Sequence, residues 1–255
     1  MTPEETLRGK VCLVTGASRA LGAEIARTLA RYGAKVAVNY HQSEEAARAL
    51  CAEIGAQGGT AVPLQADVSD AEAAARLVMT AWETLGPIYA LVNNVGPYVD
   101  TPFLELPVAD FDRILAANVR ATFLVTQAAG KRMKAEGAGH VINIAATDAF
   151  HRSHSVYGLA KSGVLYLTEA FARELAPEVG VTAIAPDLIA DNEGMDAAFV
   201  EQAVSATPLG RLVTRAEIAE MVCLLCTPAF ATLTGHTLIM DGGRTIPRIA
   251  QGPEV

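Results

Sequence analysis

The chain alternates short apolar runs with longer segments in which apolar residues recur every three or four positions. Runs of this length that are rich in Val and Ile predict buried strands, and the longer period predicts amphipathic helices. Leu21, Ile25 and Leu29, for example, share one face of a helix that follows the first run. The predicted strands are Val11–Thr15, Lys35–Tyr40, Thr60–Gln65, Tyr89–Asn93, His140–Ala145, Val181–Ile184 and Thr237–Met240.

This alternation predicts an α/β fold. Repeated strand-helix-strand units place the strands in parallel, with right-handed crossovers and with helices on both faces of the sheet. The 255 residues are 51% hydrophobic, which is enough to bury one sizeable core, and no stretch has the composition of a linker. We therefore expect one domain over residues 1–255, built as a doubly wound parallel sheet of about seven strands.

The first strand runs into a turn that contains glycine, with the sequence Thr15-Gly16-Ala17-Ser18-Arg19-Ala20-Leu21-Gly22. Gly16 and Gly22 allow the backbone to turn tightly or to lie against a ligand. The unpaired amides at the N-terminus of the following helix favour an anion. The turn is a candidate site for the pyrophosphate of a dinucleotide, although two glycines alone also serve an ordinary strand-to-helix turn.

A tyrosine and a lysine are four residues apart in Tyr157-Gly158-Leu159-Ala160-Lys161 and share one face if this segment is helical. An ammonium group beside a phenol favours the phenolate and lowers the tyrosine pKa, so that the phenol exchanges a proton with a carbonyl or an alcohol. A solvated lysine beside a half-buried tyrosine has the same spacing. The pair indicates chemistry only together with other motifs.

Those other motifs are the glycine turn, Asn93-Asn94-Val95-Gly96 after the fourth strand, and Asn118. With them, the chain resembles the classical short-chain dehydrogenase/reductase family over about residues 9–243, and in particular its ketoacyl reductases and pteridine reductases. The resemblance implies a seven-stranded Rossmann-type sheet and reduction of a carbonyl or a related C=N group. It implies that Tyr157 is the general acid, that Lys161 lowers the Tyr157 pKa and holds the ribose, and that Asn118 anchors a water.

The end of the second strand bears on the choice of cofactor. An NAD enzyme of this architecture usually has an acidic residue there, which binds the ribose hydroxyls and would repel a 2′-phosphate. This chain reads Asn39-Tyr40-His41-Gln42-Ser43, and Arg19 is placed as in NADP-preferring relatives. We therefore expect NADP(H). The cofactor contacts implied by the resemblance are Gly16, Ser18, Arg19, Leu21, Gly22, Tyr40, His41, Ser43, Asp67, Val68, Asn93, Gly96, Pro186 and Ile189.

The chain departs from the family after the fifth strand, where Ala146 stands in place of a serine that polarises the substrate carbonyl. Loss of one such donor typically lowers the rate by about 10²-fold to 10³-fold. Thr147 is the nearest replacement hydroxyl and is our candidate for a fourth catalytic residue. Ser153 and Ser155 are alternatives if the loop folds back, and Asp148 is similar to the aspartate of pteridine reductases.

Two further departures lie near the nicotinamide end. Asp187 replaces the family's glycine after the proline, and Asp191 replaces a threonine, so an acidic pair is expected to reshape the pocket or weaken nicotinamide binding. The segment 191–213 has little strand signal and is interpreted as the substrate lid. Together with Ala146, these residues leave a second hypothesis open: an NADP-binding protein with little or no turnover, acting as a sensor or a regulatory subunit.

Composition limits the classes of molecule that the protein is expected to bind. The net charge is −8, and Lys and Arg are not clustered as nucleic-acid binding requires. The acidic start of the chain and the absence of long apolar runs predict a cytoplasmic protein with no membrane partner. Cys223 and Cys226 have the spacing of a metal-binding pair but lie in an apolar helical run, so we interpret them as core residues and expect no metal.

The expected oligomeric state follows from the resemblance alone. Relatives form tetramers through two long helices, here predicted at about Asp110–Glu136 and Val156–Ala176. We therefore expect a homotetramer, in which an isologous contact buries surplus apolar surface. The residues expected to supply this surface are Leu124, Val125, Leu165, Phe171 and Leu175. The expected substrate is a small carbonyl compound or a pterin-like molecule.

Overall fold

The computed structural model describes residues 1–151, 154–192 and 195–246. Its strands are β1 Val11–Val14, β2 Lys35–Tyr40, β3 Thr60–Gln65, β4 Ile88–Asn93, β5 Gly139–Ile144, β6 Val179–Pro186 and β7 Thr237–Met240. They form one sheet in the order β3-β2-β1-β4-β5-β6-β7, and all neighbouring strands are parallel. The order reverses between β1 and β4, which is where ligands bind in open α/β sheets. The predicted Rossmann-type fold is confirmed.

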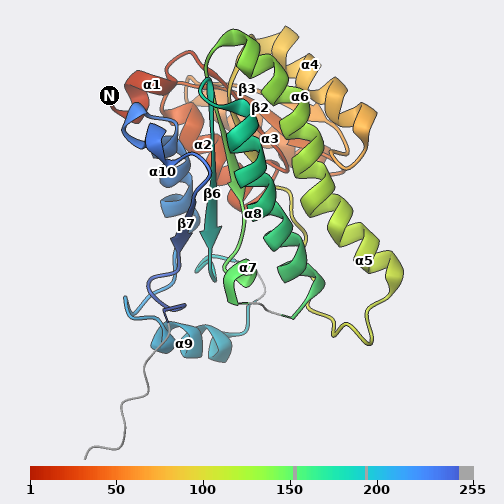
Figure 1. Cartoon of the computed structure of the whole chain (residues 1–255). Coiled ribbons are helices and arrows are strands. Elements are labelled where there is room, and N and C mark those ends of the chain that lie inside the picture. Colours follow the sequence, from red (N-terminus) through yellow and green to blue (C-terminus); the bar gives the residue numbers. More distant parts are fainter. Residues whose placement is uncertain (152–153, 193–194, 247–255) are drawn as a thin grey trace, which may run out of the picture.

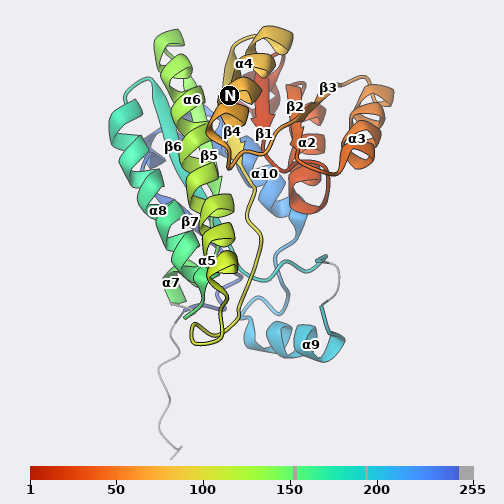
Figure 2. The ribbon, with the colours of Figure 1, turned by 90° about the vertical axis from the view of Figure 1, so that its right-hand side faces the viewer.

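Helices cover both faces of the sheet (Figures 1 and 2). The helices are α1 Pro3–Leu7, α2 Ala20–Arg31, α3 Glu44–Ala56, α4 Ala71–Leu85, α5 Val108–Leu115, α6 Ala121–Glu136, α7 Asp148–His151, α8 Val156–Leu175, α9 Ala197–Ala206 and α10 Arg215–Leu225, with a 3₁₀ turn at Pro228–Leu233. Helices α2, α3 and α10 pack on one face, and α4, α6 and α8 pack on the other. None of the helices in the described part of the chain is long and apolar enough to cross a membrane.

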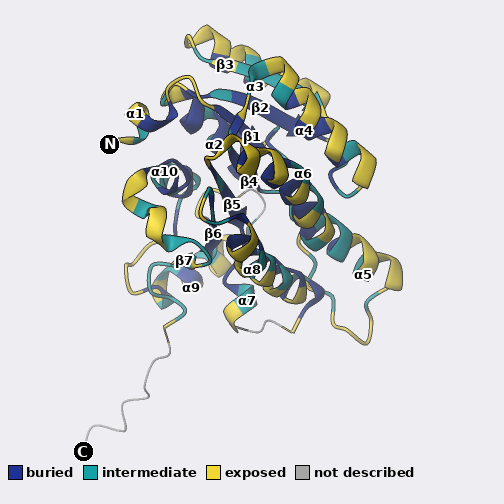
Figure 3. Ribbon diagram, turned by 45° about the horizontal axis from the view of Figure 1, so that its top comes forward, coloured by how far each residue is buried: buried dark blue, intermediate teal, exposed yellow. Residues whose placement is uncertain are grey.

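The sheet separates two apolar cores, and its central strands are buried on both sides (Figure 3). In β1, Cys12 and Val14 face α2 and α10, whereas Val11 and Leu13 face α4. Burial on both sides explains why β1 reads as a continuous apolar run rather than as an alternating one.

The two cysteines at the end of α10 are core residues, as predicted: Cys223 lies in the helix and Cys226 directly follows it. Cys223 and Cys226 are both buried in the core that also contains Cys12. Within the described ranges, no group of His, Cys, Asp and Glu side chains is arranged to hold a metal ion.

The observed β6 is longer than the predicted strand, running from Val179 to Pro186. Its first residue pairs with Gly139 of β5, and its last pairs with Met240 of β7. Proline lacks a backbone donor but is tolerated at a strand end. The extension matters because it fixes the residue after Pro186 at the carboxyl edge of the sheet.

The long helix predicted at about Asp110–Glu136 is not uniform. Helices α5 and α6 are joined by a π-helical segment, Ala116–Arg120, with Asn118 at its centre. Short π segments inside α-helices are frequent at functional sites because they redirect one side chain. The predicted lid segment contains α9, which lies beyond the carboxyl ends of the strands (Figures 1 and 2); residues 193–194 of this segment are outside the described residues.

Candidate functional site

The turn after β1 is held by two asparagine side chains, one in β2 and one directly after β4. Asn94 Nδ2 donates to the carbonyl oxygens of Thr15 and Gly16, at 3.1 Å each. Asn39 Oδ1 accepts from the Gly16 amide at 3.1 Å. A Cβ at Gly22 would lie 2.4 Å from the Gly16 carbonyl oxygen and 2.6 Å from Asn94 Nδ2, so this position accepts only glycine.

The N-terminus of α2 is open to an anion. Its N-cap residue, Arg19, is extended and makes no side-chain capping hydrogen bond, so the first amides of the helix lack a side-chain partner. Ala20, the first residue of α2, has a φ of +49°. A left-handed conformation costs a non-glycine residue about 1 kcal/mol, so the turn is slightly strained here.

A cavity of about 840 Å³ extends from this turn along the carboxyl ends of the strands. Eleven of the predicted cofactor contacts line it, namely Gly16, Ser18, Arg19, Leu21, Gly22, Tyr40, His41, Ser43, Asp67, Val68 and Gly96. Asn93, Pro186 and Ile189 are not among its lining residues. The lining also includes Asn39, Asn94 and Arg113, which the sequence did not single out as contacts.

Asn93 is directed into the protein rather than into the cavity. Its Nδ2 donates to Thr126 Oγ1 at 2.9 Å and to Asn143 Oδ1 at 2.8 Å, and Asn143 Nδ2 donates to Thr168 Oγ1 at 2.9 Å. These buried amides link β4 and β5 to the α6 and α8 layer. The alternation of side chains along β4 could have indicated this orientation. Asn93 lies two residues after the core residue Leu91 and therefore on the same face of the strand.

The adenosine end of the cavity contains one ionised acid, which lies beyond β3. Asp67 accepts hydrogen bonds from the Ser69 amide at 2.9 Å and from Ser69 Oγ at 2.7 Å. Burial opposes ionisation of Asp67 most strongly, but these bonds and the nearby His41 outweigh it, and the Asp67 pKa is lowered. No acid occurs among residues 39–43, at the end of β2.

The predicted catalytic residues Asn118 and Lys161 meet at Gly96. A Cβ at Gly96 would lie 2.6 Å from both Asn118 Oδ1 and Lys161 Nζ. Lys161 Nζ donates to the Ile144 carbonyl at 2.8 Å and lies 5.4 Å from the centre of the Tyr157 ring. Gly96 also lines the cavity, so the glycine turn and the Tyr157–Lys161 pair belong to one site.

The π segment aims Asn118 at this meeting point. Asn118 is fully buried, and its Nδ2 donates to the carbonyls of Ile114 and Pro97 at 3.1 and 3.3 Å. Its Oδ1 is buried without a hydrogen-bond partner among the described residues. A buried acceptor without a partner is costly, so this atom is suited to a water or another donor from the site's contents.

The pKa values of the pair differ from the simplest expectation. Burial lowers the pKa of Lys161 to about 8. Burial also raises the pKa of Tyr157, and Asp148 and Tyr98 raise it further. Lys161 is not among the groups that shift the Tyr157 pKa, although its ammonium lies beside the ring. Tyr157 is therefore a protonated phenol at neutral pH.

The residues proposed to replace the missing serine have other partners. Ala146 offers only a methyl group, and the Thr147 hydroxyl donates its one proton to Asp187 Oδ1 at 2.6 Å. Ser155 Oγ caps α8 by accepting from the Gly158 amide at 3.0 Å. Ser153 lies outside the described residues.

The two acids at the nicotinamide end are each paired with an arginine. Asp187 binds the guanidinium of Arg244, and its side chain is 8% exposed. Asp191 accepts from the Arg215 amide at 3.2 Å and lies 3.7 Å from its guanidinium. Both charges are thus compensated within the protein. The sequence did not indicate these pairs, because 57 residues separate Asp187 from Arg244.

Comparison with known proteins agrees with this geometry. The profile of the family described as Enoyl-(Acyl carrier protein) reductase, a short-chain dehydrogenase/reductase profile, matches residues 16–245. The chain belongs to the short-chain dehydrogenase/reductase family. It is an oxidoreductase of the kind that uses a nicotinamide cofactor.

Several relatives match over nearly their whole length. A 3-oxoacyl-[acyl-carrier-protein] reductase of Synechocystis is 39% identical over 243 residues, which cover 93% of this chain and 97% of that protein. A D-threitol dehydrogenase of Mycolicibacterium smegmatis is 35% identical over 94% of each chain. The crystal structure of a dehydrogenase/reductase from Sinorhizobium meliloti superposes with a TM-score of 0.89 at 34% identity, over 95% of this chain and 98% of that one.

The close contact at Gly22 gives a direct test of the cofactor cradle. Gly22→Ala should abolish measurable NADPH binding, because the new methyl group would displace the Gly16 carbonyl or the Asn94 amide. Gly55→Ala is the matched control: nothing lies within 4 Å of a Cβ there, and alanine favours the helix. Fluorescence titration with NADPH measures both variants. Unchanged affinity in Gly22→Ala would contradict the assigned cradle.

Proposed function

We propose that the protein reduces a ketone, an aldehyde or a related C=N group of a small molecule, with NADPH as the hydride source. The observation that carries this proposal is the convergence of Asn118 and Lys161 on Gly96, with Tyr157 beside the lysine. Gly96 itself lines the cavity that begins at the glycine turn. The relatives named as a 3-oxoacyl-[acyl-carrier-protein] reductase and a D-threitol dehydrogenase support chemistry between a carbonyl and an alcohol. They differ in substrate, and a pterin-like substrate is the second class to screen.

The residues present fit a dinucleotide. The first amides of α2 have no side-chain partner and could donate hydrogen bonds to the pyrophosphate. Gly22 has no side chain that would displace the turn around it. Arg19, His41 and Ser43 line the same cavity and would hold the 2′-phosphate. When bound, the nicotinamide supplies the hydride.

The protein's own groups handle the proton. The raised pKa of Tyr157 keeps its hydroxyl protonated, so that it is ready to donate to the carbonyl oxygen as negative charge develops there. Lys161, whose pKa is about 8, is mostly charged at neutral pH, so its ammonium can return a proton to the phenolate left behind. Asn118 Oδ1 would accept a hydrogen bond from a water that returns a proton by way of Lys161.

The second candidate function is an NADP-binding protein with little turnover. One observation favours it: Ala146 carries no hydroxyl, and the Thr147 proton is committed to Asp187. The substrate oxygen then has Tyr157 as its donor without a second hydroxyl beside it. A site with one donor fewer is expected to be slower by about 10²-fold to 10³-fold rather than inactive, so we favour the enzyme.

Substitution of the phenol separates these two functions. Tyr157→Phe should remove nearly all carbonyl reduction while leaving NADPH affinity within about twofold, because the hydroxyl serves proton transfer. Ala146→Ser should raise activity or leave it unchanged. Turnover of ketones and pterins and NADPH titration give the readouts. If wild type and Tyr157→Phe are equally inactive while Ala146→Ser creates activity, the binding protein is the correct function.

Cofactor preference rests on Arg19 and on the absence of an acid at residues 39–43. NADPH should bind more tightly than NADH, and its affinity should fall as salt rises, because the phosphate contact is ionic. Arg19→Ala should weaken NADPH binding while changing NADH binding little. Parallel titrations at low and high salt measure this, and equal affinity of the wild type for both cofactors would refute the preference.

We also propose a homotetramer built on α6 and α8, with a change in the residues that carry it. Val125, Phe171 and Leu175 are buried within the subunit, and Leu124 and Leu165 are partly buried. The large apolar side chains exposed on these helices are instead Phe123, Leu159 and Tyr166. Sedimentation equilibrium should give a tetramer at micromolar concentration, and Tyr166→Glu should weaken it. A monomeric wild type would disprove the assembly.

A further inference from the structure

A polar cluster ties together three segments at the carboxyl edge of the sheet. Asp187 Oδ1 accepts from Thr147 Oγ1 at 2.6 Å and from Arg244 Nη2 at 3.3 Å, and Asp187 Oδ2 accepts from Arg244 Nε. The backbone joins the same segments, because the Thr147 amide donates to Pro186 and the Asp187 amide donates to Met240, both at 3.1 Å. We call Thr147, Asp187 and Arg244 the edge cluster.

The turn after β7 aims Arg244 at Asp187. Gly242 and Gly243 have φ values of +63° and +87°, which reverse the chain directly after the strand. The Asp241 carboxylate accepts from the Gly243 amide at 2.8 Å and from the Thr245 amide at 2.9 Å. The backbone on both sides of Arg244 is therefore fixed, and so is the guanidinium that Asp187 holds.

Some of the hydrogen-bond donors of the Arg244 guanidinium are not used within the described part of the chain. Asp187 takes bonds from Nε and Nη2, and in the part of the chain that the structure describes, Nη1 makes no hydrogen bond. The Arg244 side chain is 31% exposed, whereas Asp187 is nearly buried. A planar guanidinium with one edge on a buried carboxylate offers its other donors to an acceptor in the open space.

The cluster lies beside the catalytic residues. Thr147 stands between Ala146, at the missing serine position, and Asp148, which begins α7. Asp148 is close enough to Tyr157, Lys161 and Arg244 to raise the pKa of all three. The hydrogen bonds from Thr147 and Arg244 to the same Asp187 carboxylate place the Arg244 guanidinium one side chain away from the loop that carries Ala146.

We propose that Arg244 is a specificity-determining residue, which donates hydrogen bonds to an oxygen acceptor that the substrate carries in addition to the reducible carbonyl. Asp187 is its positioning residue. The acceptor is a carboxylate or a second carbonyl, because the oxygen of either group accepts hydrogen bonds from a guanidinium. The substrate class is thus an oxo acid or an oxo ester. The inference rests on the proposed carbonyl reduction.

Three matched compounds test this recognition. Acetoacetate carries a carboxylate beside its ketone, ethyl acetoacetate carries an ester carbonyl, and 2-pentanone carries neither. The test variant is the double substitution Arg244→Gln with Asp187→Asn, which removes both charges and keeps hydrogen-bonding groups around Thr147. It avoids leaving a buried carboxylate unpaired.

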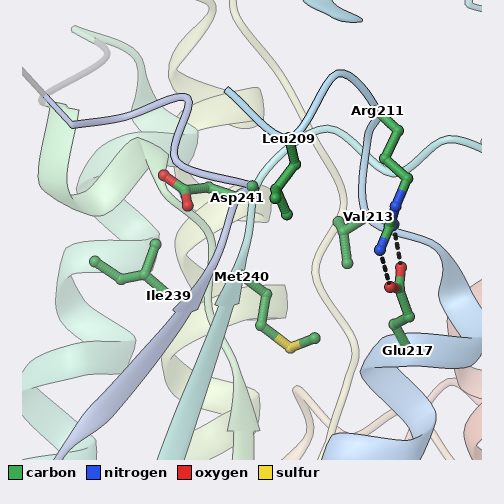
Figure 4. A pocket seen from close by; sticks show the side chains of 8 residues that line it. Leu209, Arg211, Val213, Glu217, Ile239, Met240 and Asp241 are labelled. Atoms are coloured by element: carbon green, nitrogen blue, oxygen red, sulfur yellow. Dashed lines mark hydrogen bonds and ion pairs between the residues drawn. The ribbon is translucent and has the colours of Figure 1, made fainter. Parts of the chain in front are cut away.

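Arg211→Gln is the matched control. Arg211 flanks the same end of β7, on the opposite side of a small pocket from Asp241, and both terminal nitrogens of its guanidinium are bonded to Glu217 (Figure 4). It is a second arginine near the turn whose donors are already engaged. Its substitution should leave the ratio of activities on the three compounds unchanged.

We expect the double variant to lose about 10-fold to 100-fold in kcat/KM on acetoacetate or its ethyl ester, mostly through KM, and less than about threefold on 2-pentanone. Loss on the acid alone identifies a carboxylate acceptor, and loss on both identifies a carbonyl. Equal losses on all three compounds would overturn the proposal and leave the cluster a purely structural role. So would a wild type that does not prefer either oxo compound to 2-pentanone.

A binding measurement separates this inference from the proposed function. Acetoacetate or its ester should raise the thermal midpoint of the NADP⁺ complex of the wild type, and this rise should disappear in the double variant. If the rise occurs and depends on Arg244 but no compound is reduced, the recognition stands and the enzymatic function fails. If neither compound raises the midpoint and neither is preferred in turnover, the recognition fails.

Discussion

The geometry of the site depends on which groups form hydrogen bonds with the backbone of one turn. Between β1 and α2, the Thr15 and Gly16 carbonyls and the Gly16 amide are bonded by the side chains of Asn94 and Asn39. A buried backbone group without a hydrogen-bond partner is costly, so the backbone of a turn usually forms hydrogen bonds with the nearest backbone amides. Because the side chains of Asn39 in β2 and of Asn94, directly after β4, supply these partners, the first amides of α2 are left for a ligand. The cavity, the need for glycine at position 22 and the anion site all follow from this arrangement.

Strand prediction was accurate where strand ends coincide with local signals. The bounds of β2, β3 and β7 agree with the predicted ranges, since each run ends at a change to polar or glycine residues. β6 was predicted too short, because Gly180 and Pro186 have low strand propensity, although neighbouring strands pair with both. The π segment was also missed. Its residues form an ordinary helical pattern, and the change in hydrogen bonding comes from tertiary contacts around Asn118.

In the site, the sequence predicted residues that recur in an ordered motif and missed those that meet only in three dimensions. The glycine turn, Gly96, Asn118 and Lys161 come together as expected. The acids at positions 187 and 191 were expected to disturb the nicotinamide end, yet each faces an arginine that lies 57 or 24 residues further along the chain. No periodicity or spacing indicates such a partner, because it depends on which loops cross the carboxyl edge of the sheet.

The residues that depart from the family pattern at the carboxyl edge of the sheet are physically linked to one another. A carboxylate that replaces glycine in a nearly buried position is destabilising by several kcal/mol unless it is paired and hydrogen-bonded. Asp187 meets both conditions, since Arg244 supplies the charge and Thr147 supplies the hydroxyl. The Thr147 proton is then unavailable to the substrate, just where Ala146 has removed the usual donor. The cofactor end, by contrast, keeps the geometry that a dinucleotide requires. The chain thus combines a conventional cradle with an altered substrate edge, and its specificity is set where the two loops after β5 and β6 meet the turn after β7.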